Sequence, residues 1–460
     1  MAAGHTLLIA NRGEIACRIA KTAKKMGITT VSVHSEADAG ARHVRLCDRS
    51  LFIGSGPATA NYLNIDVIIA AAKESGANAI HPGYGFLSES EELAARCARE
   101  GITFVGPDPE VISAMGDKER ARQIAKRAGV PIMPGSARME ELNTLSLRTA
   151  ADEIGYPLLV KAVAGGGGIG LRPVQIAAEL ESAANSTHQL AKRAFGNGSI
   201  YLERLVPRAR HIEVQIFGFG DGEAIHLYDR ECSIQRRYQK IIEEARAPNL
   251  PEEIRRQMAK TAIALARSCA YSGAGTVEFL YDEGRGEYFF IEMNTRLQVE
   301  HPVTEEITGI DLVEWQLLQA FDKAELASRQ TQIKTTAGHA IELRVCAEKP
   351  ERKFLPSPGR LTKVVLPKND NLRIDSGYET GDVLPSLYDN LIMKIIVHCP
   401  DRLGAIALLK ETLRSTTIEG ISTNLAFLGS IIEHPDFVSG RLHTNFVEQN
   451  IAALLPPPNK

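Results

Sequence analysis

Four consecutive glycines follow a predicted strand that contains a lysine, and this combination suits a phosphate-binding loop. The strand covers residues 157–162 and includes Lys161, and the glycines are Gly165, Gly166, Gly167 and Gly168. Glycine gives up side-chain burial and costs conformational entropy to order, so packing does not explain the run. Backbone N–H groups of such a loop can approach phosphate oxygens, and Lys161 can pair with their charge. No Gly-Lys-Ser/Thr follows, so the loop is not of the Walker type, and a flexible linker is the alternative.

Two carboxylates and one amide side chain are spaced as on a β-hairpin. Glu278 lies in one predicted strand, and Glu292 and Asn294 lie in the next. The period of two places Glu292 and Asn294 on the same face, and Glu278 can face them across the hairpin. Such oxygen ligands suit Mg²⁺, which also takes substrate phosphates. The alternative is an exposed polar sheet face, but the flanking residues are strongly apolar, and carboxylates in such surroundings are usually paired or metal-bound.

A rigid cation and a carboxylate follow this predicted metal strand. Arg296 could clamp a planar anion in a bidentate manner, and Glu300 could act as a general base. A surface salt bridge is the alternative interpretation. A third polar segment, residues 229–240, is too dense in hydrogen-bond donors for a solvated strand to be its only explanation. A nucleic-acid patch is disfavoured there, because the net charge of the chain is only −3 and aromatic residues are sparse.

The elements that must position these residues begin with a β-α-β unit. Residues 6–11 and 28–34 are predicted strands, and residues 14–26 show a helical period of apolar side chains. Helices at 67–75 and 91–100 and strands at 79–81 and 103–105 continue the pattern, which predicts a parallel α/β domain. The turn after the first strand has one glycine and lacks G-x-G-x-x-G, so a dinucleotide site there is disfavoured.

The remaining chain predicts a small insert and then antiparallel strands. A charged helix ends at residue 128, and the insert from 136 to 203 contains strands at 157–162 and 199–205. Strands at 212–217, 223–229, 275–281 and 288–294 are spaced as in hairpins. A third region has strands at 340–346, 360–365 and 391–398.

Composition narrows the class of protein. The 460 residues are 44% hydrophobic and 24% charged, which is typical of a globular protein of several domains. Seven scattered cysteines without a C-x-x-C pair predict buried thiols in a reducing compartment. No apolar run approaches membrane-spanning length and no secretory leader is evident. We therefore expect a cytoplasmic protein that binds neither membrane nor nucleic acid.

Taken together, the motifs resemble biotin carboxylase, a member of the ATP-grasp superfamily, over nearly the whole chain. The matching strings are I-A-N-R-G-E-I-A (9–16), H-P-G-Y-G-F-L-S-E (81–89), M-G-D-K (115–118), G-G-G-G (165–168), R-H-I-E-V-Q (210–215), R-E-C-S-I-Q-R-R-Y-Q-K (230–240), E-M-N-T-R-L-Q-V-E-H-P-V-T-E (292–305) and L-P-S-P-G (355–359). Their number and order make the resemblance specific.

The resemblance implies a role for each matching residue. The implied ATP ligands are Lys118, Lys161, the glycines 165–168, Glu203, Arg204, Val206, His211, Gln235, Glu278 and Glu292. The implied Mg²⁺ or Mn²⁺ ligands are Glu278, Glu292 and Asn294. The implied bicarbonate and biotin site comprises Lys240, Arg296, Gln298, Val299, Glu300, Arg344 and Tyr84. Within it, Glu300 resembles the base that deprotonates bicarbonate, and Arg344 resembles the residue that stabilises the biotin enolate.

The resemblance also implies an architecture and partners. It implies an ATP-grasp fold of mixed α/β and α+β class, with a Rossmann-like parallel domain (1–115), an ATP-grasp domain (116–337) with a mobile glycine-loop lid (about 132–205), a C-terminal antiparallel-sheet domain (338–448) and a tail (449–460). The implied partners are a separate biotin carboxyl carrier protein, a carboxyltransferase and a second copy of the chain. The only Met-Lys pair, Met393-Lys394, lies inside an apolar strand, so we expect no biotin on this chain itself.

Two departures leave the final carboxyl acceptor open. The family usually has Lys or Arg where this chain has Ile169, and His where it has Tyr238. Ile169 and residues 249–251 resemble the urea carboxylase branch, whereas H-P-G-Y-G resembles acyl-CoA carboxylase subunits, and residues 311–315 resemble both. We favour an acetyl-CoA carboxylase type of acceptor, with urea carboxylase as the alternative. A different ATP-grasp ligase would leave Arg344 unexplained, and a non-catalytic nucleotide-binding regulator would be expected to lack a metal or base residue.

Overall fold

The computed structural model describes residues 4–163, 170–195, 197–330 and 337–455. Residues 6–104 provide a five-stranded parallel sheet in the order β3-β2-β1-β4-β5. Its strands are β1 (Thr6–Ile9), β2 (Thr29–His34), β3 (Arg49–Phe52), β4 (Ala79–His81) and β5 (Thr103–Phe104), and the helices around it are α1 (Gly13–Lys25), η1 (Glu36–Asp38), α2 (Arg42–Leu46), η2 (Ala58–Ala60), α3 (Ile65–Ser75), α4 (Glu91–Arg99) and α5 (Pro109–Gly116). The predicted parallel α/β region is confirmed.

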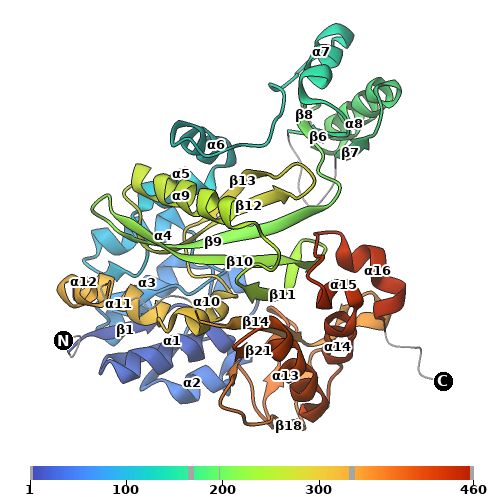
Figure 1. Ribbon diagram of the computed structural model, residues 1–460. Helices are drawn as coiled ribbons and strands as arrows, with labels where there is room; N and C mark the ends of the chain where they lie inside the picture. Colours follow the sequence, from blue (N-terminus) through green and yellow to red (C-terminus); the bar gives the residue numbers. More distant parts are fainter. Residues whose placement is uncertain (1–3, 164–169, 196, 331–336, 456–460) are drawn as a thin grey trace.

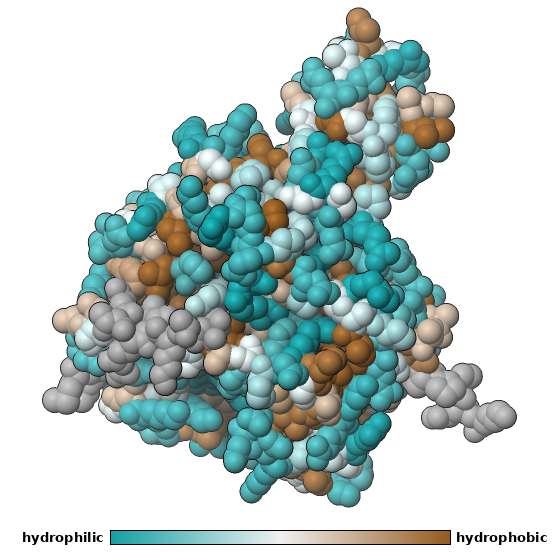
Figure 2. Space-filling view, viewed as in Figure 1, coloured by the Kyte–Doolittle hydropathy of each residue, from teal (hydrophilic) through white to brown (hydrophobic). Residues whose placement is uncertain are grey.

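A small lobe stands off from the body of the chain (Figure 1). After α6 (Lys118–Arg127), it comprises α7 (Thr144–Ile154), β6 (Leu158–Ala162), β7 (Leu171–Val174), η3 (Ala177–Glu179), α8 (Leu180–Phe195) and β8 (Ile200–Arg204). Its antiparallel sheet has the order β7-β6-β8 and encloses a core of its own, with Leu158, Val160, Ile200 and Leu202 fully buried. Figure 2 shows hydrophilic residues over most of the viewed face of lobe and body. The predicted insert is therefore a lobe with an independent core.

One antiparallel sheet of eight strands organises the rest of the chain, in the order β13-β12-β9-β10-β11-β14-β21-β19. Its strands are β9 (Ala209–Phe219), β10 (Ala224–Arg236), β11 (Gln239–Ala245), β12 (Ser272–Asp282), β13 (Glu287–Asn294), β14 (His339–Cys346), β19 (Leu372–Ser376) and β21 (Leu391–Cys399). The helices are α9 (Glu252–Ser268), α10 (His301–Thr308), α11 (Leu312–Phe321), α12 (Lys323–Gln330), α13 (Arg402–Ser415), α14 (Leu425–Glu433), α15 (Pro435–Val438) and α16 (Phe446–Leu454). The C-terminal strands thus extend the central sheet, because β14 pairs with β11.

Short elements complete the C-terminal region, and one of them corrects a prediction. They are β15 (Glu348–Lys349), η4 (Pro350–Arg352), β16 (Leu355–Pro356), β17 (Gly359–Arg360), β18 (Lys363–Val365), β20 (Val383–Leu384) and β22 (Thr417–Glu419). The single strand predicted at 360–365 is wrong, because β17 pairs with β20 while β18 pairs with β22. The chain changes partner at Leu361, which is fully buried.

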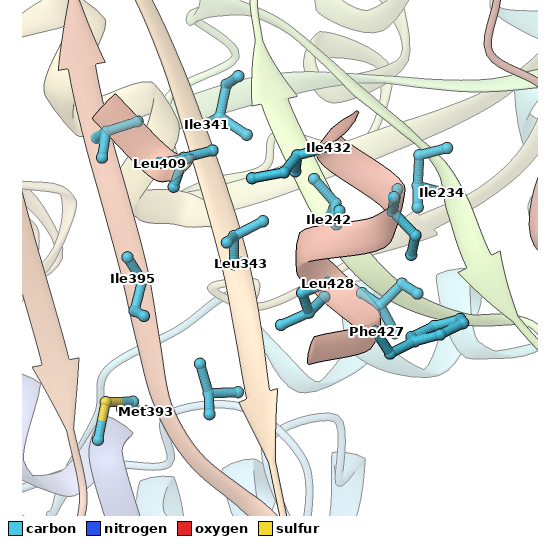
Figure 3. Packing of buried hydrophobic residues seen from close by; sticks show 14 of the residues in the cluster. Ile234, Ile242, Ile341, Leu343, Met393, Ile395, Leu409, Phe427, Leu428 and Ile432 are labelled. Atoms are coloured by element: carbon cyan, nitrogen blue, oxygen red, sulfur yellow. The ribbon is translucent and has the colours of Figure 1, made fainter. Parts of the chain in front are cut away.

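The two faces of the sheet differ sharply at β11, β14 and β21. On one face, Ile242, Leu343 and Ile395 pack with residues of α13 and α14 in a continuous apolar core (Figure 3). The period of two turns the intervening residues to the other face. These intervening side chains are Glu243, Glu342, Arg344 and Lys394, and the pairing register places Glu342 opposite Glu243 and Lys394 opposite Arg344. The sheet therefore has an apolar side and a charged side, and α10 covers the charged side.

Candidate active site

The predicted metal ligands lie together on the β12–β13 hairpin. Glu278 is the direct cross-strand neighbour of Glu292, and Thr276 is the neighbour of Asn294. The Asn294 Nδ2 donates to Glu278 Oε1 at 2.8 Å. Burial and the charge of Glu278 raise the pKa of Glu292. The raised pKa shows that nearby cations do not fully offset the charge of Glu292. Two adjacent carboxylates and an amide oxygen in this state fit a hard divalent cation.

Lys240 joins the hairpin to the rest of the site. Its Nζ donates to Glu213 Oε2 at 2.6 Å, to Glu300 Oε1 at 2.8 Å and to Glu278 Oε1 at 2.9 Å. The oxygen of Gln298 lies 3.4 Å away, and the Gln298 amide donates to Glu278 at 2.8 Å. Burial alone would lower the pKa of Lys240, but these carboxylates hold it well above its ordinary value. Lys240 is therefore a fixed cation at the centre of the site.

Glu300 lies between two cations. Its second oxygen accepts from Arg344 Nη2 at 2.9 Å, opposite the contact with Lys240. Burial alone would raise the pKa of Glu300, but Lys240, Arg344 and the buried Arg230 hold it well below its usual range. Glu300 is thus deprotonated, as the predicted general base must be, and the paired cations lower its basicity.

The loop before Glu300 is held from several sides. Arg296 Nη2 donates to Asn294 Oδ1 at 2.9 Å, and its Nε donates to Glu89 Oε2 at 3.1 Å. The carbonyl of Val299 accepts from Lys394 Nζ at 2.7 Å. Glu89 closes one of the sequence motifs, but no role was expected for it. Its part in the site depends on a contact between residues 207 positions apart.

The predicted nucleotide ligands that the structure describes come from the lobe, from α6 and from the central sheet. Lys161 Nζ donates to Glu203 Oε1 at 2.7 Å, which joins β6 and β8. The His211 Nε2 lies 2.8 Å from Glu278 Oε2, and Lys118 starts α6 close enough to lower the pKa of Glu292. Gln235 is the cross-strand neighbour of Lys240, and Val206 is buried just after β8. The glycines 165–168 and Ile169 lie outside the described residues.

Two predicted residues point to other partners. Arg204 donates to Glu287 Oε2 at 2.7 Å and lies over the ring of Phe289. The Tyr84 hydroxyl donates to Glu14, whose Oε1 is 3.2 Å from Lys394 Nζ. The implied roles of Arg204 in binding ATP and of Tyr84 in binding biotin therefore stay predictions.

One cavity within the described part of the chain lies away from these residues. It measures about 580 Å³, lies between α9 and the strands β9 and β10, and has Val214 among its lining residues. Val214 and Glu213 are consecutive in a strand and point to opposite faces, so this cavity is on the reverse side from Lys240. A second cavity of about 370 Å³ borders the β10–β11 turn at Arg236, Arg237 and Gln239. We assign the chemistry to the polar cluster, where the ionisable groups converge.

Three family models cover the chain in order. They are biotin carboxylase, N-terminal domain (residues 3–112), carbamoyl-phosphate synthase L chain, ATP binding domain (117–324) and biotin carboxylase C-terminal domain (342–449). Biotin carboxylase 1 of Bacillus subtilis is 46% identical over 442 residues, which are 96% of this chain and 98% of that protein. This chain belongs to the biotin carboxylase family. The predicted resemblance and ATP-grasp fold class are confirmed.

Some relatives are considerably longer than this chain. Methylcrotonoyl-CoA carboxylase subunit alpha of Dictyostelium discoideum is 46% identical over 452 residues. The aligned region covers 98% of this chain but only 64% of that subunit. The urea carboxylase structure from Kluyveromyces lactis is 39% identical, with a TM-score of 0.77 over 96% of this chain and 32% of that one.

Solved biotin carboxylase structures match this chain over nearly their full length. Biotin carboxylase from Campylobacter jejuni has a TM-score of 0.86 and 43% identity over 96% of this chain and 98% of that chain. The biotin carboxylase domain dimer of Hydrogenobacter thermophilus 2-oxoglutarate carboxylase, described in complex with MgADP, ADP and bicarbonate, has a TM-score of 0.87 and 41% identity over 98% and 99%.

Two further predictions from the sequence concern the cysteines and membrane-spanning segments. All seven cysteines are free thiols; five are buried, as predicted, whereas Cys269 and Cys346 are half-buried. Among the described residues, every helix is too short or too polar to cross a membrane.

Proposed function

We propose that this chain carboxylates biotin, using ATP, Mg²⁺ and bicarbonate, as the first half-reaction of a biotin-dependent carboxylase. The observation that carries the proposal is the chain of contacts Lys240–Glu300–Arg344 beside the pair Glu278 and Glu292. It combines an anion-binding cation, a deprotonated carboxylate, a second buried cation and a metal-ligand pair within one polar cluster. Each is needed by one step of that chemistry.

In the first step, Lys240 and Arg296 would bind bicarbonate beside Glu300. Bicarbonate is a poor nucleophile, so Glu300 takes its proton as the oxygen attacks the γ-phosphate of ATP. Contact with the substrate anion draws Lys240 away from Glu300, which raises the basicity of that carboxylate. Mg²⁺ held by Glu278, Glu292 and Asn294 would offset the phosphate charge. The product of this step is carboxyphosphate.

In the second step, carboxyphosphate breaks down to CO₂ and phosphate next to biotin. The phosphate takes the ureido proton of biotin, and the ureido nitrogen of the resulting enolate then attacks CO₂ to form carboxybiotin. Until that bond forms, the enolate oxygen needs a fixed positive charge. Arg344 suits this role because guanidinium stays protonated at any working pH. Its Nε is buried and has no hydrogen-bond partner among the described residues, so a donor is free for the substrate.

We further propose a separate carrier protein and an acyl-CoA acceptor. Lys394, of the only Met-Lys pair, is fully buried, so it cannot carry biotin in the fold. The acyl-CoA carboxylase relative is 46% identical and the urea carboxylase 39%, which favours an acyl-CoA acceptor over urea. Acetyl-CoA as the acceptor, a homodimer and the cytoplasmic location stay predictions, and some relatives are named mitochondrial.

The test is ATP hydrolysis by the purified chain, measured with and without bicarbonate and free biotin. We expect bicarbonate-dependent turnover that free biotin increases. Glu300→Gln should abolish this turnover while ATP still binds, because only the base is lost. Glu283→Gln, at an exposed turn between β12 and β13, is the matched control. Turnover that ignores bicarbonate and biotin would overturn the function, and undiminished turnover in Glu300→Gln would remove Glu300 from the mechanism.

A further inference from the structure

Arg344 is shared by two buried carboxylates, and the proposed mechanism uses only one of them. The same atom, Nη2, lies 2.9 Å from Glu300 Oε2 and also contacts Glu243 Oε1 as an ion pair. Glu243 is fully buried, and among the described residues its oxygens accept no hydrogen bond. Burying a carboxylate is costly unless a cation pairs with it. The cation that pairs with Glu243 is Arg344, which the proposed mechanism also uses, so a functional role for Glu243 has to be considered.

The position of Glu243 is set by the sheet. It lies on β11 directly opposite Glu342 of β14, and Arg344 is two residues further along β14 on the same face. The next residue, Glu244, points to the other face, where it binds Arg402 and His339. These two consecutive buried glutamates therefore have different contacts: Glu244 binds Arg402 of α13, and Glu243 faces the candidate active site.

Glu243 rather than Glu342 is the anion that holds Arg344. Burial raises the pKa of Glu342 well above its ordinary value, and neither of its oxygens has a partner in the described part of the chain. Burial and the charge of Glu300 also raise the pKa of Glu243, to about 7, against the opposing effect of Arg344. The charged or titratable groups recorded as acting on Glu243 are Arg344, Glu342, Glu300, Lys240 and Cys232. Glu243 is thus ionised above neutral pH.

The two anchors of Arg344 differ during turnover. Before the reaction, both Glu300 and Glu243 attract Nη2. Once Glu300 has accepted the bicarbonate proton it is neutral, and its attraction for Arg344 falls. The enolate step comes next and needs Arg344 in place with Nε free. Resting on the function proposed above, we propose that Glu243 is a positioning residue that keeps Arg344 in place for the biotin half of the reaction after Glu300 has been protonated.

The test compares two rates in the intact chain, the bicarbonate-dependent ATP turnover without biotin and the increment that free biotin adds. Glu243→Gln keeps the shape and an acceptor oxygen but removes the charge. We expect the biotin increment to fall about 10- to 100-fold, the range for losing one charge-assisted contact. The rate without biotin should change by less than about threefold. Glu244→Gln is the matched control, which should lower the melting temperature without changing the ratio of the two rates.

The pH dependence adds a readout that a structural role would not move. In the parent chain, the ratio of biotin-dependent to biotin-independent turnover should rise as pH increases towards about 7, because a protonated Glu243 attracts Arg344 less and its pKa is at most about 7 once Glu300 is neutral. This rise should be absent in Glu243→Gln. Glu243→Asp, which keeps the charge, should restore the rise and part of the increment. If the glutamine variant does not fold, the aspartate variant and the pH profile of the parent chain still test the role of Glu243.

The outcomes separate this inference from the function on which it rests. Absence of bicarbonate-dependent turnover in the parent chain overturns the function itself. Turnover in the parent, with equal loss of both rates or no loss in Glu243→Gln, overturns only the role of Glu243. A flat ratio between pH 6 and 8 in the parent also overturns it, as does an aspartate variant that behaves like the glutamine variant.

Discussion

Replacing Lys394 with methionine is expected to lower the free energy of unfolding by about 3–5 kcal/mol, the usual cost of removing one partner of a buried ion pair. Lys394 is fully buried in β21, where its Nζ donates to the Val299 carbonyl at 2.7 Å and lies 3.2 Å from Glu14 Oε1. Methionine fills similar space but offers neither charge nor donor. The variant therefore leaves a carbonyl and a carboxylate without this partner in the interior.

The size of the effect follows from how many groups depend on this one cation. Burial raises the pKa values of Glu14 and Glu342, and Lys394 is the main group that opposes the rise for each. If all 460 residues unfold together, the entropy of unfolding is about 1 kcal/mol per degree at the usual value per residue. The loss then lowers the melting temperature by about 3–5 °C. Differential scanning calorimetry measures this shift.

The loss of stability in Lys394→Met should depend on pH. Without Lys394, the native pKa values of Glu14 and Glu342 rise further above their unfolded values. The native variant then binds more protons than the unfolded chain between these values, so its stability falls as pH rises. The deficit should be larger at pH 8 than at pH 5. Lys368→Met, at an exposed lysine, is the control and should change stability by less than about 0.5 kcal/mol. A deficit no larger than the control's, or one that grows toward pH 5, would refute the reasoning.

Three further predictions concern cofactor and carrier. Glu292→Gln should raise the Mg²⁺ concentration for half-maximal ATP turnover at least about tenfold, since one anionic ligand is lost; an unchanged Mg²⁺ titration would remove Glu292 from the metal site. Ile169→Arg should lower the KM for ATP several-fold with little change in kcat, because an added cation near phosphate is worth about 1 kcal/mol. A KM that is unchanged or raised at an equal melting temperature would show that this position does not contact phosphate. A streptavidin blot of the purified chain should show no covalent biotin, since Lys394 is buried; a positive band would contradict this.

Local patterns predicted much of the site from the sequence alone. Alternation placed Glu292 and Asn294 on one face, and the hairpin brought Glu278 opposite them, as the strand register confirms. The predicted strand at 223–229 was right but short. β10 continues to Arg236 past a register shift between His226 and Asp229, where the alternation that marks a strand is interrupted.

What the sequence did not reveal depends on contacts between distant segments or on exposed edges. β3 was missed because it is an edge strand with mostly exposed side chains, so it has no apolar alternation. The partners of Lys240 and Arg344 at Glu213 and Glu243 were also missed, because each glutamate stands beside apolar residues in its strand and nothing nearby in the sequence indicates its partner. Nothing local distinguishes Glu243 from Glu244. Their opposite roles follow only from the pairing of β11 with β14.

That pairing also changes how the C-terminal region relates to the chemistry. The family models separate residues 117–324 from 342–449, yet the sheet runs without interruption from β11 to β14. Glu300 is provided by the segment before this division and Arg344 by the segment after it, and their side chains meet at 2.9 Å. The proposed base and the proposed enolate-stabilising cation must keep a fixed separation, and α10, which begins right after Glu300 and packs on the sheet that carries Arg344, holds them more rigidly than two domains joined by a linker would. The C-terminal strands are therefore part of the proposed active site, and the boundary between the sequence families passes through it.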